Sequence, residues 1–256
     1  MTIAAASPSQ KAGQYFPSAS GALAFPNNVA AGSLLTIVGW CYTGSTDDRP
    51  VLGDLTQTAG TAVLGPISRD LVNTRDVGAS NFLHEIHYSV IVKTSGSLTL
   101  TLNGGASGLS CYLAFDEYTG TWDEKRVVDM AAANGDGTPP SSGNATSTGP
   151  GLFVGGLMHI NATTGSAATE DGAFTLIDEE DSTPSNVGGS AISRIVTGAT
   201  TDAAEWSMSA PTDWIATLVV YQEAEAAASP RIPTLSSAGA GDITSTEARP
   251  RVTLTW

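Results

Sequence analysis

The chain has 256 residues, with 25 acidic and 11 basic side chains, a formal net charge of −14 and a pI near 4.3. This charge argues against nucleic acid or an anionic membrane as a partner, because both attract basic surfaces. Hydrophobic residues make up 41% of the chain and charged residues 14%, so there is enough apolar material for a packed core and global disorder is excluded. The length suits one large domain, since all-β sandwiches run to about 200–250 residues as a single unit.

Apolar residues recur along the chain with a period of two rather than 3.6, which predicts strands. In chain order, we expect strands over residues 34–42, 88–92, 98–102, 109–116, 152–160, 173–177, 192–196, 206–208 and 214–221. Clusters of Gly, Ser, Thr, Asn and Pro separate them, a spacing typical of an antiparallel sandwich or jelly roll. The best helix candidate, 223–228, is too short to be stable without packing.

Three local patterns carry more detailed expectations. The segment 34–42 is apolar on both faces, which predicts a central strand covered on both sides. Residues 98–102 and 109–116 flank an Asn-Gly-Gly sequence, which favours a hairpin between these two strands. The range 134–151 has no periodicity and is expected to be a long loop. No internal repeat with a fixed period is found in the sequence.

These patterns divide the chain into three parts. Residues 1–20 are rich in Ala, Ser and Pro and are expected to form an N-terminal arm, and residues 21–222 are expected to form one jelly-roll β-sandwich. Residues 223–256 are expected to form a linker and an extended C-terminal arm that ends in one more strand, in which Val252, Leu254 and Trp256 alternate with polar residues. Its three arginines give this tail a different charge balance from the acidic body, so we expect it to dock on a body, its own or a neighbour's. A flexible, solvated tail is the alternative.

Cysteine and histidine give no sign of a reactive site. Cys41 and Cys111, the only cysteines, lie 70 residues apart in apolar runs and are expected to be buried, reduced thiols. His84 and His87 are separated by three positions on an expected strand, which sends their rings to opposite faces. We therefore expect no metal site there, and surface or half-buried histidines instead.

Other catalytic signatures are also missing. The sequence has no G-x-S-x-G nucleophile motif, no C-x-x-C pair and no phosphate-binding loop. Its densest acidic run, residues 178–181, fits a solvated loop better than the paired carboxylates of a glycosidase or a calcium site. We expect a protein that is not an enzyme and that uses no cofactor or metal.

The five tryptophans fall into two groups. Trp40, Trp206 and Trp214 lie in expected strands and are expected to be core residues. Trp122, in an expected turn, and Trp256, at the end of the C-terminal arm, are the better candidates for contact with another molecule.

The sequence also lacks transport signals. No run of about 18 apolar residues that could span a bilayer occurs, and the N-terminal segment has no secretory pattern. We expect a protein made in a host cytoplasm and not secreted.

Four segments resemble parts of the jelly-roll modules of bacteriophage virion proteins and bacterial surface proteins. AFPNNVAAGSLL at 24–35 is similar to their F-P-x-x-V-x-A-G-x-L-L opening, and FDEYTG at 115–120 resembles their E-Y-x-G strand end. EWSMS at 205–209 with WIATLVVY at 214–221 resembles their closing pair of strands. The segment 243–254 resembles a terminal segment of phage structural proteins.

The resemblance implies a non-catalytic sandwich used for assembly or attachment, with no catalytic residue to carry over. It leads to the hypothesis of a capsid decoration or cement protein, located in the virion, that binds neighbouring subunits through its C-terminal arm. The partners would be the major capsid protein or copies of this chain itself, as a homo-oligomer for which a symmetric trimer suits a shell. The expected contact residues are Arg249, Arg251, Val252, Leu254, Trp256 and Trp122.

Two alternatives stay open. The same fold would serve as a tail-fibre or adhesin module that binds host glycan through loop aromatics such as Trp122. A carbohydrate-binding module or a glycoside hydrolase is the third possibility, against which the missing secretory pattern and the sparse catalytic groups count.

Overall fold

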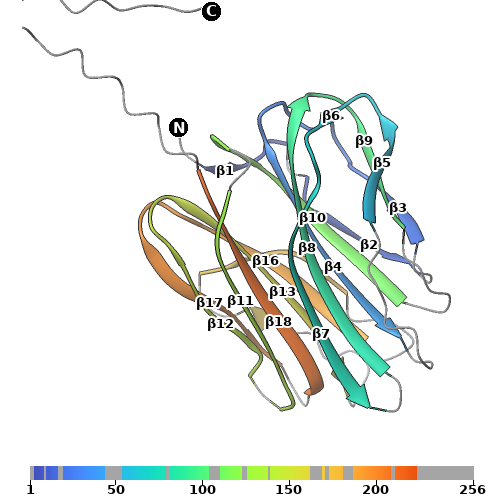
Figure 1. The fold of residues 1–256 in the computed structure, drawn as a ribbon, viewed down its shortest axis with the longest axis vertical. Coiled ribbons are helices and arrows are strands. Elements are labelled where there is room, and N and C mark those ends of the chain that lie inside the picture. Colours follow the sequence, from blue (N-terminus) through green and yellow to red (C-terminus); the bar gives the residue numbers. More distant parts are fainter. Residues whose placement is uncertain are drawn as a thin grey trace, which may run out of the picture. The chain divides into compact units, whose positions relative to one another are not determined.

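The computed structural model describes residues 3–8, 10–16, 20–43, 54–78, 81–103, 110–122, 126–137, 139–161, 169–170, 173–180, 187–208 and 211–223. The chain divides into Met1–Ala224 and Glu225–Trp256, and the description concerns the first of these. Every regular element among these described residues is a β-strand, and all of the strands pair in antiparallel sheets (Figure 1). The all-β prediction is thus confirmed for the described residues. They include no helix with the length and apolarity needed to cross a membrane.

The strands fall into two consecutive halves, which we call the first half (described residues up to 122) and the second half (described residues from 126). The first half contains β1 (Ala4–Ala5), β2 (Ala12–Phe16), β3 (Ser20–Ala24), β4 (Leu34–Thr43), β5 (Asp54–Gly60), β6 (Val63–Leu64), β7 (Ser68–Gly78), β8 (Asn81–Thr94), β9 (Leu98–Asn103) and β10 (Ser110–Thr119). The second half contains β11 (Val127–Gly135), β12 (Ser141–Ser147), β13 (Gly151–Asn161), β14 (Thr169–Glu170), β15 (Thr175–Glu180), β16 (Val187–Val196), β17 (Thr200–Ser207) and β18 (Pro211–Gln222).

The two halves have the same strand order. In the first half, a large sheet runs β2-β10-β4-β8-β7, with the short strands β1 and β6 extending it, and a small sheet runs β3-β9-β5. In the second half the large sheet runs β11-β18-β13-β16-β15 and the small sheet β12-β17-β14. Taken in chain order, each strand of the first large and small sheets has a counterpart in the second. The range 21–222, expected to be one sandwich, therefore contains two sandwich-like halves. Their topology is repeated although the sequence shows no repeat with a fixed period.

The strand registers place individual residues in matching positions. On β4, Leu34 pairs with Tyr118 of β10 and with Ile91 of β8. On β13, Leu152 pairs with Tyr221 of β18 and with Ile195 of β16. The matched pairs are Leu34 and Leu152, Tyr118 and Tyr221, and Ile91 and Ile195. The repetition thus extends from the strand order to single positions.

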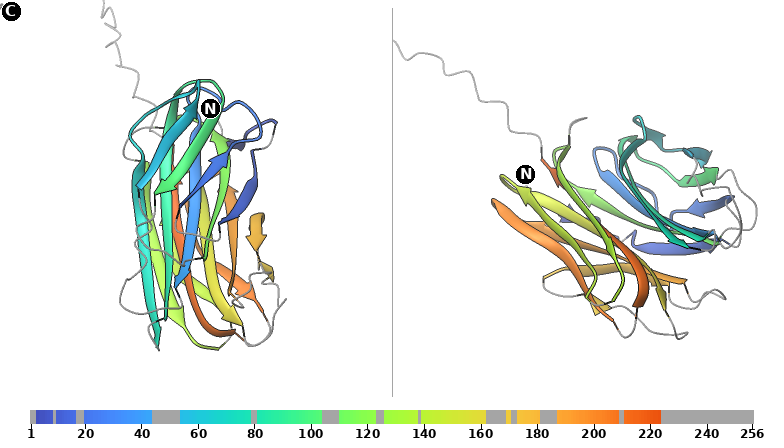
Figure 2. Two further views of the ribbon diagram at one scale, coloured as in Figure 1. Left: turned by 90° about the vertical axis from the view of Figure 1, so that its right-hand side faces the viewer. Right: turned by 60° about the horizontal axis from the view of Figure 1, so that its bottom comes forward.

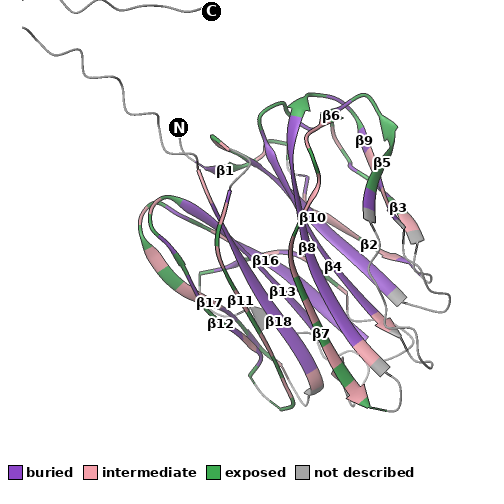
Figure 3. Cartoon of the chain, viewed as in Figure 1, coloured by how far each residue is buried: buried purple, intermediate pink, exposed green. Residues whose placement is uncertain are grey.

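Three hydrophobic clusters lie between the sheets. Figure 2 shows the sheets from two further sides, and Figure 3 shows which parts of their strands are buried. The first cluster joins the small and large sheets of the first half, and includes Leu100 and Ile37. The second cluster joins the two large sheets, and includes Trp40 and Val154. The third cluster joins the sheets of the second half around Trp206. Both large sheets are therefore covered on both faces, as continuous apolar strands require.

Strand β4 is the clearest success of the sequence pattern. It lies between β10 and β8, with Leu35 and Ile37 in the first cluster and Leu34 and Val38 in the second. The predicted central strand with two covered faces is confirmed. The core assignment of Trp40, Trp206 and Trp214 is confirmed as well, because all three are buried.

Two local predictions were wrong. Strands β9 and β10 do not pair with each other: β9 lies in the small sheet and β10 in the large sheet, so the chain crosses between layers instead of forming a hairpin. The range 134–151 contains β12, which pairs with β17. Its inward residues are Ser142, Ala145 and Ser147, and such small, mostly polar side chains give no apolar alternation for a pattern to detect.

The N-terminal range also differs from the expected arm. Within residues 1–20, β1 and β2 pair with β10 and form an edge of the first large sheet. The helix candidate 223–228 falls almost entirely outside the described residues.

The cysteine prediction was wrong as well. Cys41 and Cys111 are both buried, as expected, but they form a disulfide. The two residues lie directly opposite each other on the neighbouring strands β4 and β10. Their separation of 70 residues in sequence concealed this pairing.

Candidate functional site

A buried polar cluster joins the two large sheets. Glu85 and His87 point from β8 toward the second half, and Thr217 of β18 lies between them. His87 Nε2 is 2.6 Å from Thr217 Oγ1 and 3.4 Å from Glu85 Oε1, and the Thr217 hydroxyl donates to that same oxygen. Burial raises the pKa of Glu85, although hydrogen bonding and the charge of His87 oppose the shift. The cluster links the halves and is closed to solvent, because all three residues are at most 1% exposed.

Glycines of the second half make room for this packing. A Cβ on Gly156 would lie 1.9 Å from Glu85 Oε1, and a Cβ on Gly189 would lie 2.3 Å from the Trp40 ring. The Trp40 ring is itself held in place by stacking on Tyr112, with ring centroids 4.6 Å apart. Large side chains of the first half thus pack against bare backbone of the second.

A second polar cluster lies nearer the end of the molecule where the halves are linked. Nε and Nη2 of Arg126, 3.0 and 2.6 Å away, donate to Ser89 Oγ, which donates to Asp70. The Tyr221 hydroxyl also donates to Asp70, at 2.9 Å. Burial, followed by the negative charge of Asp70, raises the pKa of Tyr221 far above its usual value. Tyr221 is therefore a neutral donor, and Asp70 and Arg126 are bridged through Ser89.

The matching position in the other half has the same residue types. Tyr118 corresponds to Tyr221, and Ser193, which faces it, corresponds to Ser89. Burial and then the charge of Asp116 raise the pKa of Tyr118. The tyrosine of each half therefore meets the serine of the other half, which is the contact pattern of a two-fold arrangement.

The histidines are more buried than expected. His84 and His87 do lie on opposite faces of β8, but they are only 7% and 1% exposed, so the prediction of surface or half-buried rings was wrong. The ring of His159, on β13, is also buried, and burial lowers its pKa to about 4. Among the described residues, no group of three or more His, Cys, Asp or Glu side chains is arranged to hold a metal ion.

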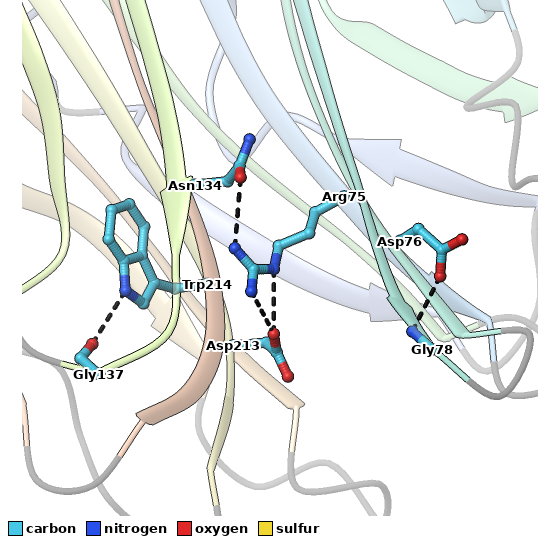
Figure 4. Close-up of polar contacts among 7 residues, drawn as sticks. All are labelled: Arg75, Asp76, Gly78, Asn134, Gly137, Asp213 and Trp214. Carbon is cyan, nitrogen blue, oxygen red and sulfur yellow. Dashed lines mark hydrogen bonds and ion pairs between the residues drawn. The ribbon is translucent and has the colours of Figure 1, made fainter.

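At the opposite end, an ion pair ties β7 to β18 (Figure 4). Arg75 donates from Nε and Nη2 to Oδ1 of Asp213, at 3.0 and 2.6 Å, and from Nη1 to Asn134. Trp214 donates its indole N–H to the carbonyl of Gly137 at 2.9 Å. Arg75 comes from the first half and its partners from the second, so this pair is another contact between the halves.

The described residues line at least three open cavities near the link between the halves. The first, of about 210 Å³, is lined by Gly65, Pro66, Ser68, Ile91, Lys93 and Arg126. The second, of about 460 Å³, has a wall formed by Lys11, Asp116, Tyr118, Thr175, Ser193, Arg194 and Ile195, with Ala5 and Ala173. We name them the Arg126 cavity and the Lys11 cavity.

These two cavities occupy matching places in the two halves. Ser68 pairs with Ser89 and Thr175 pairs with Ser193, so Ser68 corresponds to Thr175. Ile91 of one cavity corresponds to Ile195 of the other. The repeated fold has therefore produced two related cavities with different charges.

The third cavity, of about 430 Å³, is lined by the predicted contact residue Trp122, and we name it the Trp122 cavity. Its lining also includes Ser33, Thr119 and Thr121, with the backbone of two glycines. Trp122 is half-buried, and its indole N–H donates to the carbonyl of Tyr118 at 3.1 Å. The ring is thus fixed in the wall of the cavity. The other predicted contact residues, Arg249, Arg251, Val252, Leu254 and Trp256, lie outside the described residues.

Sequence reasoning missed Ser89, Lys93 and Arg126. One weak signal existed: SVIV at 89–92 and SRIV at 193–196 are alike and occupy matching positions on β8 and β16. Comparison of the chain with protein-family models, with curated proteins and with solved structures finds no match.

Proposed function

We propose that this chain is a non-enzymatic structural protein of a virus particle, a capsid decoration or cement protein that binds neighbouring subunits. The observation that carries the proposal is the strand order. A jelly roll places its first, eighth, third and sixth strands in one sheet and its second, seventh, fourth and fifth in the other, and viral capsid and lectin domains use it widely.

Each half supports a jelly-roll assignment with one departure. Numbered from β2 or from β11, and with β1 and β6 set aside, the first, eighth, third and sixth strands share the large sheet, and the second, seventh and fourth share the small one. The fifth strand, β7 or β15, pairs with the sixth instead of the fourth. Two such sandwiches that share a hydrophobic cluster would suit the surface of a particle.

The buried ionisable groups support the same proposal. Glu85, His87 and Thr217 contact each other between the sheets, where a substrate has no access. Asp70, Ser89 and Arg126 are likewise bonded to one another. These groups join the two halves, which is a structural role.

The proposed attachment uses the C-terminal arm. Val252, Leu254 and Trp256 would add a strand to the sheet edge of a neighbour, where main-chain hydrogen bonds give affinity and side chains give register. Arg249 and Arg251 would pair with carboxylates of that neighbour. Repetition over a shell would strengthen the weak individual contacts by avidity.

Truncation tests this mechanism. A chain lacking residues 230–256 should lose binding to purified particles in a co-sedimentation assay, while its circular dichroism and thermal unfolding stay those of the full chain. Full binding by the truncated chain would refute attachment through the arm.

A second candidate function is glycan binding by an adhesin or tail-fibre module, and the Trp122 cavity favours it. Sugar sites combine an aromatic platform with a few polar groups, and this cavity offers a fixed indole beside Ser33, Thr119 and Thr121. Trp122→Ala should then abolish binding on a glycan array without changing particle binding. If the unaltered chain binds no glycan on the array, this candidate function is excluded.

A further inference from the structure

The Arg126 cavity stands out by charge in a strongly acidic chain. Lys93 and Arg126 line it, and none of the described residues in its wall is acidic. Arg126 is only 5% exposed, and such deep burial of a guanidinium requires partners. Its Nε and Nη2 reach Ser89, and through Ser89 its charge meets that of Asp70.

Lys93 is the unbalanced charge of this group. Asp70 offsets Arg126, and Tyr221 stays neutral because its pKa is raised. Lys93 is exposed at the mouth of the cavity. Its side chain runs past Gly65, where a Cβ would lie 3.2 Å from Cε, and Gly65 is held to the carbonyl of Ile91 by a hydrogen bond of 2.8 Å. The described groups therefore leave one net positive charge.

In the Lys11 cavity, at the matching position of the other half, the positive charges are balanced by negative ones. Lys11 donates to the carbonyl of Leu176 at 2.9 Å, and Asp116 lines the same wall. Arg194 is paired with Asp202. Ala5 occupies the edge strand of this cavity, next to the position that corresponds to Arg126. The excess positive charge is therefore particular to the Arg126 cavity.

We propose that the Arg126 cavity binds the carboxylate of an acidic side chain, a glutamate above all, presented by a polypeptide partner. A charge of +1 matches a carboxylate, whereas a phosphate carries about −1.5 to −2 at pH 7. Ile91 and Pro66 give the wall an apolar part on which the methylene groups of the side chain would pack.

Size and composition point to a side chain rather than to a whole ligand or an acidic sugar. The volume of about 210 Å³ is below the roughly 300–1,000 Å³ typical of sites that enclose a drug-sized molecule. No aromatic residue is among the described residues of its wall, and sugar sites depend on aromatic platforms. The site belongs to the body and does not depend on the C-terminal arm.

Isothermal titration calorimetry of the full chain with a hexaglutamate peptide tests the proposal, with hexaglutamine as the neutral probe. We expect hexaglutamate to bind and hexaglutamine not to bind. Lys93→Glu should weaken binding at least about tenfold, because an attraction becomes a repulsion. The matched control is Arg69→Glu, which makes the same charge change. Arg69 is exposed, follows Ser68 in the chain, pairs with Tyr88 and is not part of the described cavity wall. This variant should change binding less than about twofold.

Three results would overturn the proposal: no binding of hexaglutamate at millimolar concentration, equal losses in the two variants, or tighter binding of oligogalacturonate or of a phosphoserine peptide. The first would leave no carboxylate site, the second would indicate unspecific attraction, and the third would indicate another class of ligand. Because Lys93 is exposed, thermal unfolding should show that the variant is folded. A negative result would leave attachment through the arm untouched.

Discussion

The two halves of the body share a strand order but solve the same packing problems with different residues. At one matched position of the third strand, the first half has Cys41, bonded to Cys111, and the second half has the buried His159. On facing strands, the first half supplies the bulk of Trp40 and the second half supplies Gly189. The comparison teaches that this topology needs an alternation of inward and outward residues, and that the particular inward residues can differ widely.

The disulfide gives the largest expected difference between the halves. Closing a loop of 70 residues should stabilise the fold by about 4 kcal/mol in the chain-entropy picture. Replacing both Cys41 and Cys111 by Ala should lower the free energy of unfolding, measured with urea, by about that amount. Two titratable thiols in the denatured, unreduced protein would contradict the disulfide.

The buried His159 of the second half should make the stability of the fold sensitive to acid. The folded pKa of His159, about 4, lies below its ordinary value of about 6.5, so the unfolded chain takes up the proton first as the pH falls. The contribution of His159 to stability is therefore fully present above about pH 6.5 and is lost as the pH falls to about 4.

The measurement is the difference in unfolding free energy between the unaltered chain and His159→Leu at pH 7 and at pH 4. Between pH 7 and pH 4, the unaltered chain should lose about 3 kcal/mol of unfolding free energy relative to His159→Leu. Using the difference cancels the opposite contributions of Glu85 and Asp116, whose raised pKa values favour the folded state in acid. An unchanged difference would show that folding does not lower the pKa of His159.

Close packing between the halves should make Gly189 intolerant of a side chain. In Gly189→Ala the new Cβ would meet the buried Trp40 ring, and overpacking of this kind costs about 1–3 kcal/mol. Gly198→Ala is the matched control, because nothing lies within 4 Å of a Cβ there. Equal stability of the two variants in thermal unfolding would mean that the facing sheets are less tightly packed than described.

The smallest effect is expected at the ion pair between Arg75 and Asp213. Both side chains are partly exposed, so solvent screens their attraction and the coupling energy should be below about 1 kcal/mol. A double-mutant cycle with Arg75→Ala and Asp213→Ala measures it. A coupling energy of several kcal/mol would contradict this and would make the pair a major stabilising contact between the halves.

The sequence pattern located strands whose inward residues are large and apolar, such as β4 and β13. It missed β12, and it also missed β7 and β11, whose alternation combines partly buried and exposed residues without a strong apolar stripe. Pairing partners were harder still, because β9 and β10 are neighbours in sequence and belong to different sheets.

The candidate sites show the same limit. Trp122 could be selected from sequence because a tryptophan outside a strand is unusual, and it does line a cavity. Lys93 and Arg126 come from separate segments that only the packing of the two halves brings together. A single charged residue in a sequence carries no record of such a neighbour, so the Arg126 cavity could not be predicted.

We propose that this chain is a component of a virus particle rather than a catalyst. Quantitative mass spectrometry of density-purified virus particles from the source of this sequence tests it most directly. We expect the chain to co-purify with the major capsid protein in many copies per particle. Absence of the chain from intact particles would contradict a structural role in the particle.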